Sequence, residues 1–230
     1  MMKKMKKINI FNISRLKTYT DGDGISTLVG CTGCPLRCAY CLNPYSWDRS
    51  VESYNLTAEE LFDKIKIDNL YFLSTGGGVV FGGGEPLIYS KFIQEFINEY
   101  KSTGWKFGLE TSLSTNNDHL KDIIGLIDFY IVDTKDMNRQ RYESYTLGDY
   151  DLFIDNLKYL RDNVESEKIK LRVPKIPGLH ASNEVNENQE ILRNMGFENI
   201  EMFNYIKPEL RMELSEVAFN RLSEFLNQIK

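Results

Sequence analysis

The residues of this chain best suited to metal chemistry are its four cysteines, which lie close together as Cys31, Cys34, Cys38 and Cys41. The last three have the spacing Cys-x3-Cys-x2-Cys, which lets one tight loop present three thiolates to a single cubane iron–sulfur cluster. Three protein ligands leave one iron of such a cluster open. Because electron carriers more often use four cysteines, this spacing predicts a cluster that takes part in a reaction.

Two other uses of the cysteines fit the spacing less well. A structural zinc site usually takes two Cys-x2-Cys pairs that lie roughly 12 to 20 residues apart, whereas here only three residues separate the two pairs. A disulfide framework is disfavoured because we find no signal peptide and the chain is too long to depend on disulfides. The role of Cys31 stays open between a buried thiol, a redox-active residue and an occasional fourth ligand, and we favour the buried thiol.

The composition bounds the class of protein. A chain of 230 residues, 42% hydrophobic and 27% charged, can bury a full core, and we expect a single domain over residues 1–230. A net charge of -5 disfavours a general nucleic-acid binder, and no apolar run approaches the ~20 residues needed to span a bilayer. We therefore expect a cytoplasmic monomer that binds neither nucleic acid nor membrane.

The elements that must position the cysteines alternate along the chain. Strands are expected near residues 8–13, 27–30, 79–81, 106–110, 129–133, 168–173 and 200–205, and helices near 57–67, 89–102, 118–127, 151–163, 185–195 and 214–229. About six strand–helix units of one polarity indicate a parallel sheet covered by helices. Such units either close partially into a barrel or lie open as a doubly wound sheet. We predict an α/β fold, a partial (β/α)6 barrel of parallel strands with outer helices.

Polar or glycine-rich residues follow successive predicted strands. In parallel α/β folds the carboxyl ends of the strands form the active-site face, so these distant segments should converge on one cavity. Taken alone, Thr111 and Ser112 read as ordinary capping or turn residues. The segments are 34–41, 82–85, 110–112, 133–135 and Arg172.

These segments resemble the radical S-adenosylmethionine enzymes, and among them the activating enzymes of glycyl radical enzymes, of the pyruvate formate-lyase activating type. The resemblance covers nearly the whole chain. It rests on Asp-Gly-Asp-Gly-Ile at 21–25, the cysteine loop at 33–44 with Trp47, Gly-Gly-Gly-Glu-Pro at 82–86, Asp-Thr-Lys with Met-Asn at 133–138, and Arg-Val-Pro-Lys-Ile-Pro-Gly at 172–178.

The resemblance implies a 4Fe-4S cluster held by Cys34, Cys38 and Cys41, with S-adenosylmethionine on the open iron. One electron, from flavodoxin or ferredoxin, would cleave the cofactor to methionine and a 5'-deoxyadenosyl radical that abstracts hydrogen from a substrate carbon. For the activating enzymes that carbon belongs to a glycine of a partner glycyl radical enzyme. As with other cofactors, the task of the protein is to position the cofactor and exclude water and oxygen.

The resemblance also assigns residues to the cofactor. Backbone at Gly83, Gly84 and Glu85 would approach its methionine moiety, where a side chain would be in the way. Tyr40 is expected to face the adenine.

Four charged residues are expected on the cofactor's polar end. Glu110 would accept from the ammonium group or help to hold a monovalent cation, Asp133 and Lys135 would lie near the carboxylate and that cation, and Arg172 would lie near the cofactor.

Two departures from the family pattern widen the range of functions. Many activating enzymes carry histidines where this chain has Leu42 and Ile206, and we expect His119 and His180 to be solvated. A small radical enzyme that modifies another peptide or a small molecule, as in the deazaguanine synthases, is therefore a second hypothesis. A third, non-enzymatic one is an iron–sulfur electron carrier or sensor that uses all four cysteines.

Overall fold

A computed structural model describes residues 6–18, 21–48 and 53–205. Its strands form one eight-stranded sheet in the order β3-β1-β2-β4-β5-β6-β7-β8. The expected helix at 214–229 lies outside the described residues. The strands are β1 (Ile8–Thr18), β2 (Ile25–Cys31), β3 (Tyr54–Leu56), β4 (Gly78–Gly83), β5 (Lys106–Thr111), β6 (Phe129–Asp133), β7 (Ile169–Lys175) and β8 (Ile200–Asn204).

The sheet is open and mostly parallel, which confirms the predicted α/β fold. Strands β2 and β4 to β8 run parallel, each pairing with its neighbour in the sheet. The first strand departs from the expectation of one polarity, because β1 is antiparallel to both β2 and the short β3. Only six residues join β1 to β2, and a connection that short cannot carry the chain back to start a parallel strand.

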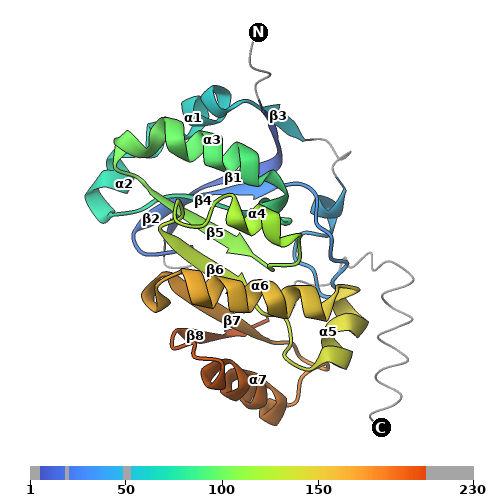
Figure 1. Cartoon of the computed structure of the whole chain (residues 1–230). Helices are drawn as coiled ribbons and strands as arrows, with labels where there is room; N and C mark the ends of the chain where they lie inside the picture. The colour runs from blue at the N-terminus through green and yellow to red at the C-terminus, as the bar shows by residue number, and fades with distance from the viewer. Residues whose placement is uncertain (1–5, 19–20, 49–52, 206–230) are drawn as a thin grey trace.

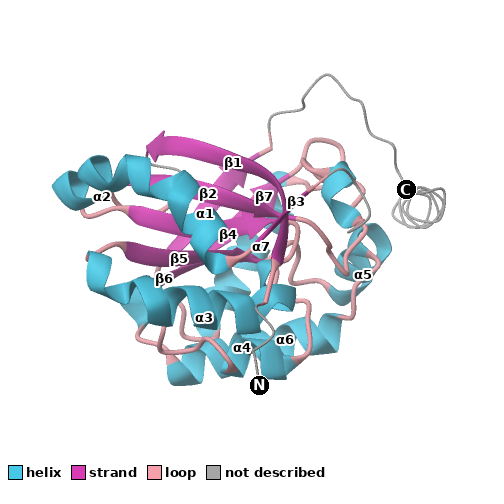
Figure 2. Ribbon diagram, turned by 90° about the horizontal axis from the view of Figure 1, so that it is seen from above, coloured by secondary structure: helices cyan, strands magenta, loops and turns pink. Residues whose placement is uncertain are grey.

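The helices pack outside the sheet, and α3, α4 and α6 lie along one of its faces (Figures 1 and 2). Most of them match the sequence pattern, including the capping box at Thr57 and Glu60 that begins α1. The short helices α2 and α5 were not predicted. The helices are α1 (Ala58–Ile65), α2 (Asn69–Thr75), α3 (Ser90–Tyr100), α4 (Asn117–Lys121), α5 (Arg139–Thr146), α6 (Tyr150–Asn163) and α7 (Ser182–Asn194). Among the described residues, no helix has the length and apolar character needed to cross a membrane.

Aromatic side chains fix α3 onto the sheet. The Phe96 ring of α3 meets Phe81 of β4 edge to face, with 5.7 Å between centroids, and Phe107 of β5 at 6.2 Å. Offset and edge-to-face aromatic pairs of this kind add about 0.5–1.5 kcal/mol beyond the area that they bury. The apolar face of the sheet is thus covered, and its carboxyl edge is left for the loops.

The cysteine loop is held at that edge from two sides by backbone hydrogen bonds. On one side the loop after β4 donates to it, from Gly84 N to Cys31 O at 2.9 Å and from Glu85 N to Gly33 O at 2.8 Å. On the other side the loop donates to the carboxyl end of α5, from Arg37 N to Thr146 O at 2.8 Å and from Ala39 N to Tyr145 O at 2.7 Å. These bonds are possible because the last carbonyls of a helix have no partner within the helix.

We predict that Gly84→Ala destabilises the protein by about 3 kcal/mol, at the upper end of the cost of overpacking. A Cβ atom at Gly84 would lie 2.5 Å from Gly33 O and 2.8 Å from Cys31 O, and backbone atoms cannot turn away. The measurement is urea unfolding of the metal-free protein.

The matched control is Gly76→Ala. Gly76 has a φ of +72°, and no atom lies within 4 Å of the position that a Cβ would take there. Only the left-handed backbone should therefore cost free energy, about 1 kcal/mol. Equal losses for the two variants would contradict the close approach of the two loops.

Candidate active site

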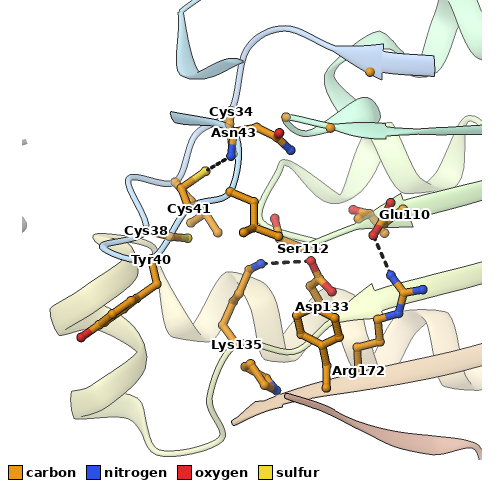
Figure 3. Close-up of a pocket in the computed structure, with 18 of the residues that line it drawn as sticks. Cys34, Cys38, Tyr40, Cys41, Asn43, Glu110, Ser112, Asp133, Lys135 and Arg172 are labelled. Atoms are coloured by element: carbon orange, nitrogen blue, oxygen red, sulfur yellow. Dashed lines mark hydrogen bonds and ion pairs between the residues drawn. The ribbon is translucent and has the colours of Figure 1, made fainter. Parts of the chain in front are cut away.

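A cavity of about 450 Å³ opens at the carboxyl edge of the sheet, within the ~300–1,000 Å³ usual for ligand sites. All but one of the expected site residues line it, drawn from four strands or strand ends and the cysteine loop (Figure 3). They are Cys34, Cys38, Cys41, Tyr40, Gly83, Gly84, Glu110, Asp133, Lys135 and Arg172.

The three thiols of the loop are free and partly exposed to the cavity. Burial raises the pKa of Cys38 to about 12, against which the Lys135 ammonium acts to lower it. At Cys41 burial also raises the pKa, while hydrogen bonds from the backbone N–H of Asn43, 3.4 Å from Sγ, and from the Trp47 side chain lower it. The thiols are therefore protonated at neutral pH on their own, and a metal would have to displace those protons.

The donor set fits a multi-iron cluster better than a single ion. Among the described residues, no three His, Cys, Asp or Glu side chains converge closely enough to coordinate one ion. In a cubane cluster each thiolate binds a different iron, so the sulfur atoms need not converge on a single point. Three thiols on one loop, facing one cavity, have the chemistry that such a cluster requires.

Lys135 brings a positive charge to the cavity wall beside these thiols. Its Nζ donates to Asp133 Oδ2 at 3.1 Å. Burial alone would lower the pKa of Lys135, but the Asp133 carboxylate and Cys38 outweigh it and the pKa is raised. The backbone of Lys135 has a φ of +57°, a left-handed conformation that is uncommon outside glycine and must be stabilised by its surroundings.

A second ion pair lies across the same wall, where Arg172 Nη1 donates to Glu110 Oε1 at 2.7 Å. Burial and the nearby Asp133 carboxylate raise the pKa of Glu110 to about 7, although Arg172 acts in the opposite direction. In Figure 3 the pairs Glu110–Arg172 and Asp133–Lys135 lie next to each other, with the cysteines facing Lys135. The cavity thus offers separate acidic and basic groups to a zwitterionic ligand.

Gly83, which ends β4, and Gly84, which follows it, both line the cavity, and protein atoms crowd the position of a side chain at each. A Cβ at Gly83, whose φ is +93°, would lie 2.8 Å from the Phe11 ring, and one at Gly84 would meet the cysteine loop. The steric demand therefore comes from the protein itself. Both backbones still reach the cavity.

Glu85, whose backbone was expected near the cofactor, is not among the residues that line the cavity, and its side chain has another role. It is fully buried, and its carboxylate accepts from Thr111 Oγ1 at 2.6 Å, from Ser112 N at 2.9 Å and Ser112 Oγ at 2.6 Å, and from Leu87 N at 3.1 Å. Glu85 therefore ties the end of β4 to the end of β5. Thr111 and Ser112, which taken alone read as capping or turn residues, bind it and also line the cavity, as expected of the segment 110–112.

Cys31 is placed apart from the other cysteines. It is fully buried in the main hydrophobic core, its Sγ is 3.7 Å from Val29 O, and burial raises its pKa well above the ordinary range of a thiol. It does not line the cavity. These are the surroundings of a structural core thiol.

The prediction that both histidines are solvated is wrong. The His180 side chain is completely buried and bonded to Ile176 N and Asp136 Oδ2. His119 is half-buried, with Nδ1 3.0 Å from Ser90 Oγ. Nothing in the local sequence marks His180 as buried, because its charged partner, Asp136, comes from the loop after β6.

Further aromatic and aliphatic side chains complete the cavity, and of these the sequence individually singled out only Leu42 and Tyr40. Tyr45 and Leu42 are each 52% exposed at its rim and Phe203 is 39% exposed. Tyr205, at the end of β8, donates from its hydroxyl to Tyr40 O and packs edge to face on the Tyr40 ring. Ile206, expected to replace a family histidine, lies outside the described residues.

The family model of the radical SAM superfamily matches residues 28–185, well over half of the chain. The chain therefore belongs to this superfamily. Membership implies a 4Fe-4S cluster and S-adenosylmethionine as its cofactors, in agreement with the donor set of the cavity.

Within the superfamily, the chain is similar to the pyruvate formate-lyase-activating enzyme of Staphylococcus aureus, with 32% identity over 144 residues. That match covers 60% of this chain and 57% of the relative, so the chain spans just over half the length of the curated relatives that it matches.

Solved structures share the fold. A domain of the pyruvate-formate lyase-activating enzyme of Bacteroides vulgatus matches with a TM-score of 0.50 and 20% identity, over 66% of this chain and 94% of that domain. SuiB of Streptococcus suis bound to its precursor peptide SuiA matches with a TM-score of 0.62 and 15% identity, over 88% of this chain and 45% of SuiB.

The raised pKa of Glu110 predicts how stability depends on pH. The folded state favours the protonated carboxyl of Glu110. The contribution of this group to the free energy of unfolding is therefore fully present below the ordinary glutamate pKa of about 4.3, and it is lost as pH rises through about 7. The stability of the metal-free protein relative to Glu110→Gln should fall by about 1–3 kcal/mol between pH 5 and pH 8. Urea unfolding at several pH values measures it.

Glu60→Gln is the control for that series. Glu60 caps α1 and its pKa is lowered by its hydrogen bonds to Thr57, so it stays ionised above pH 5 in both states. The difference in free energy of unfolding between Glu60→Gln and the unmodified protein should therefore not change between pH 5 and pH 8. A flat difference for Glu110→Gln as well would contradict the burial of Glu110 beside Asp133.

Proposed function

We propose that this radical SAM enzyme activates a glycyl radical enzyme by abstracting hydrogen from one of its glycines. The observation that carries the proposal is the cavity that joins three free thiols to the ion pairs of β5, β6 and β7. The similarity to an activating enzyme at 32% identity supports the choice among radical SAM activities.

In this proposal Cys34, Cys38 and Cys41 would hold a 4Fe-4S cluster with an iron left open for S-adenosylmethionine. The chemistry that these cofactors would supply is one-electron reductive cleavage of S-adenosylmethionine, which yields methionine and the 5'-deoxyadenosyl radical for hydrogen abstraction. The electron comes from flavodoxin or ferredoxin. The cavity walls hold the cofactor still and keep bulk water away from it.

The charged groups of the cavity suit the amino acid end of the cofactor. Lys135 offers an ammonium group to its carboxylate, and Glu110 offers a carboxylate to its ammonium. Arg172 orients Glu110 through their 2.7 Å hydrogen bond, and Asp133 does the same for Lys135. Carbonyls of Gly83 and Gly84 add acceptors, and Tyr40 packs on the adenine. A monovalent cation would have to share carboxylates that already carry cationic partners.

The cysteines give the most direct test of the cluster. After anaerobic reconstitution, Cys38→Ala should lose most of its bound iron and sulfide and cleave S-adenosylmethionine at the background rate, because the cluster loses one of its three protein ligands. Cys31→Ala should keep the full iron content and cleave the cofactor, because Cys31 lies in the core outside the cavity. Iron analysis and deoxyadenosine release measure both properties.

Loss of iron and of S-adenosylmethionine cleavage in Cys31→Ala would favour the electron carrier or sensor, because that function needs all four cysteines. Since a buried thiol is removed, Cys31→Ser and Cys31→Ala should both be tested, and the unfolding midpoint of each should be recorded without iron.

The activating function predicts a radical on the partner. Reduced, reconstituted enzyme mixed with S-adenosylmethionine and a candidate glycyl radical enzyme should produce the doublet of a glycyl radical by electron paramagnetic resonance. Replacing the acceptor glycine of the partner by alanine is the control, and it should abolish the signal. Deoxyadenosine formation without a glycyl radical on any partner would count against this function.

A second function is favoured by the rim of the cavity. Leu42, half-exposed at the mouth, stands where activating enzymes usually carry histidine, so another peptide or a small molecule is the alternative substrate. Deuterium transfer into deoxyadenosine from a labelled candidate of that kind would support it. Transfer from a partner's glycine alone would exclude it.

A further inference from the structure

A buried polar cluster that does not line the cavity surrounds Asp136. This residue has no exposed surface. Its carboxylate accepts from His180 Nε2 at 2.9 Å, from Arg141 Nε at 2.8 Å and Nη2 at 3.3 Å, and from Asn138 N at 2.7 Å. Arg141 also pairs with Glu184 at the start of α7. The cluster therefore joins the loop after β6, helix α5 and the loop between β7 and α7.

The hydrogen bonds indicate the tautomer of the neutral His180 ring. Its Nδ1 accepts from Ile176 N at 3.2 Å, so in the neutral ring the proton is on Nε2, which donates to Asp136. The Tyr145 ring meets the imidazole edge to face, with 6.3 Å between centroids. Because both ring nitrogens are used, His180 holds Asp136 and Ile176 at a set separation.

Both residues that His180 holds are next to the cavity wall. Ile176 lines the cavity, and Asp136 directly follows Lys135, which also lines it. Burial alone would raise the pKa of Asp136, but hydrogen bonds from His180 and Arg141 lower it below its ordinary value. Asp136 is therefore an ionised, fully hydrogen-bonded residue that directly follows Lys135 in the chain, and it anchors the backbone there.

Lys135 needs such an anchor because its backbone is left-handed, with a φ of +57°. On its other side Thr134 is fixed by bonds from N and Oγ1 to Arg172 O, at 3.1 and 3.0 Å. Met137 N donates to Asn188 Oδ1 at 3.1 Å. A non-glycine residue in this region costs of order 1–3 kcal/mol, so loss of the anchor would let the loop relax and move the ammonium.

We infer that His180 is a positioning residue, which through Asp136 holds Lys135 where it can bind the carboxylate of S-adenosylmethionine. The inference rests on the proposed function for the role of Lys135. Its structural part, the restraint of residues 134–138 by His180, does not depend on that role.

The test compares His180→Leu, His180→Gln and Asp136→Asn with the unmodified protein. In the metal-free protein, His180→Leu should raise hydrogen exchange at residues 134–138 about tenfold. In the reconstituted protein it should weaken S-adenosylmethionine binding about tenfold. Glutamine keeps an N–H donor for Asp136, so His180→Gln should recover most of both losses. Asp136→Asn keeps the size of the side chain but removes its charge, and it should behave like His180→Leu.

Thr27→Val is the matched control for general destabilisation. Thr27 is fully buried and its hydroxyl donates to Asp68 Oδ2 at 2.8 Å, and it does not line the cavity. This variant should lower the unfolding midpoint and leave both other readouts unchanged. Unchanged exchange and binding in His180→Leu, or equal changes in Thr27→Val, would overturn the inference. Failure of the unmodified, cluster-loaded protein to bind the cofactor would instead reject the proposed function, while the exchange experiment would still test the anchor.

Discussion

The site depends above all on how the backbone of the cysteine loop is fixed. Two bonds from the loop after β4 and two to the carboxyl end of α5 hold residues 31–39 from opposite sides. The first pair requires Gly84, because any side chain there would collide with loop carbonyls. This docking fixes the backbone from which the three thiols face one cavity.

The charged wall of the cavity shows a division between groups that face the ligand and groups that hold them. Lys135 and Glu110 face the cavity, each paired with an oppositely charged neighbour. Behind them Glu85 and Asp136 are completely buried, and each accepts four hydrogen bonds. A buried carboxylate is costly unless it is fully bonded, so these two acids fix loops firmly, and both follow strand ends that form the cavity.

Much of the fold could be predicted because it depends on local pattern. Alternating apolar strands and amphipathic helices indicated the parallel α/β fold, and Thr57 and Glu60 marked the start of α1. Two of the elements that escaped prediction lack such a pattern: α5 carries polar and tyrosine residues around its whole circumference, and β3 has three residues. The antiparallel direction of β1 follows from its short connection to β2, a constraint that the periodicity of the strands does not contain.

The sequence by itself determined the chemistry, because cysteine spacing is a property of neighbours along the chain and strand ends of a parallel sheet must share one edge. The charged residues that it assigned to the site through their side chains all line the cavity, but it did not indicate that Lys17 and Asp21 line it too. Only the tertiary structure decided what each residue touches. In the structure Cys31 lies in the hydrophobic core, Glu85 links the ends of β4 and β5 by hydrogen bonds, and His180 is a buried partner of Asp136. Their partners come from distant segments, and burial depends on those segments rather than on the residues beside them.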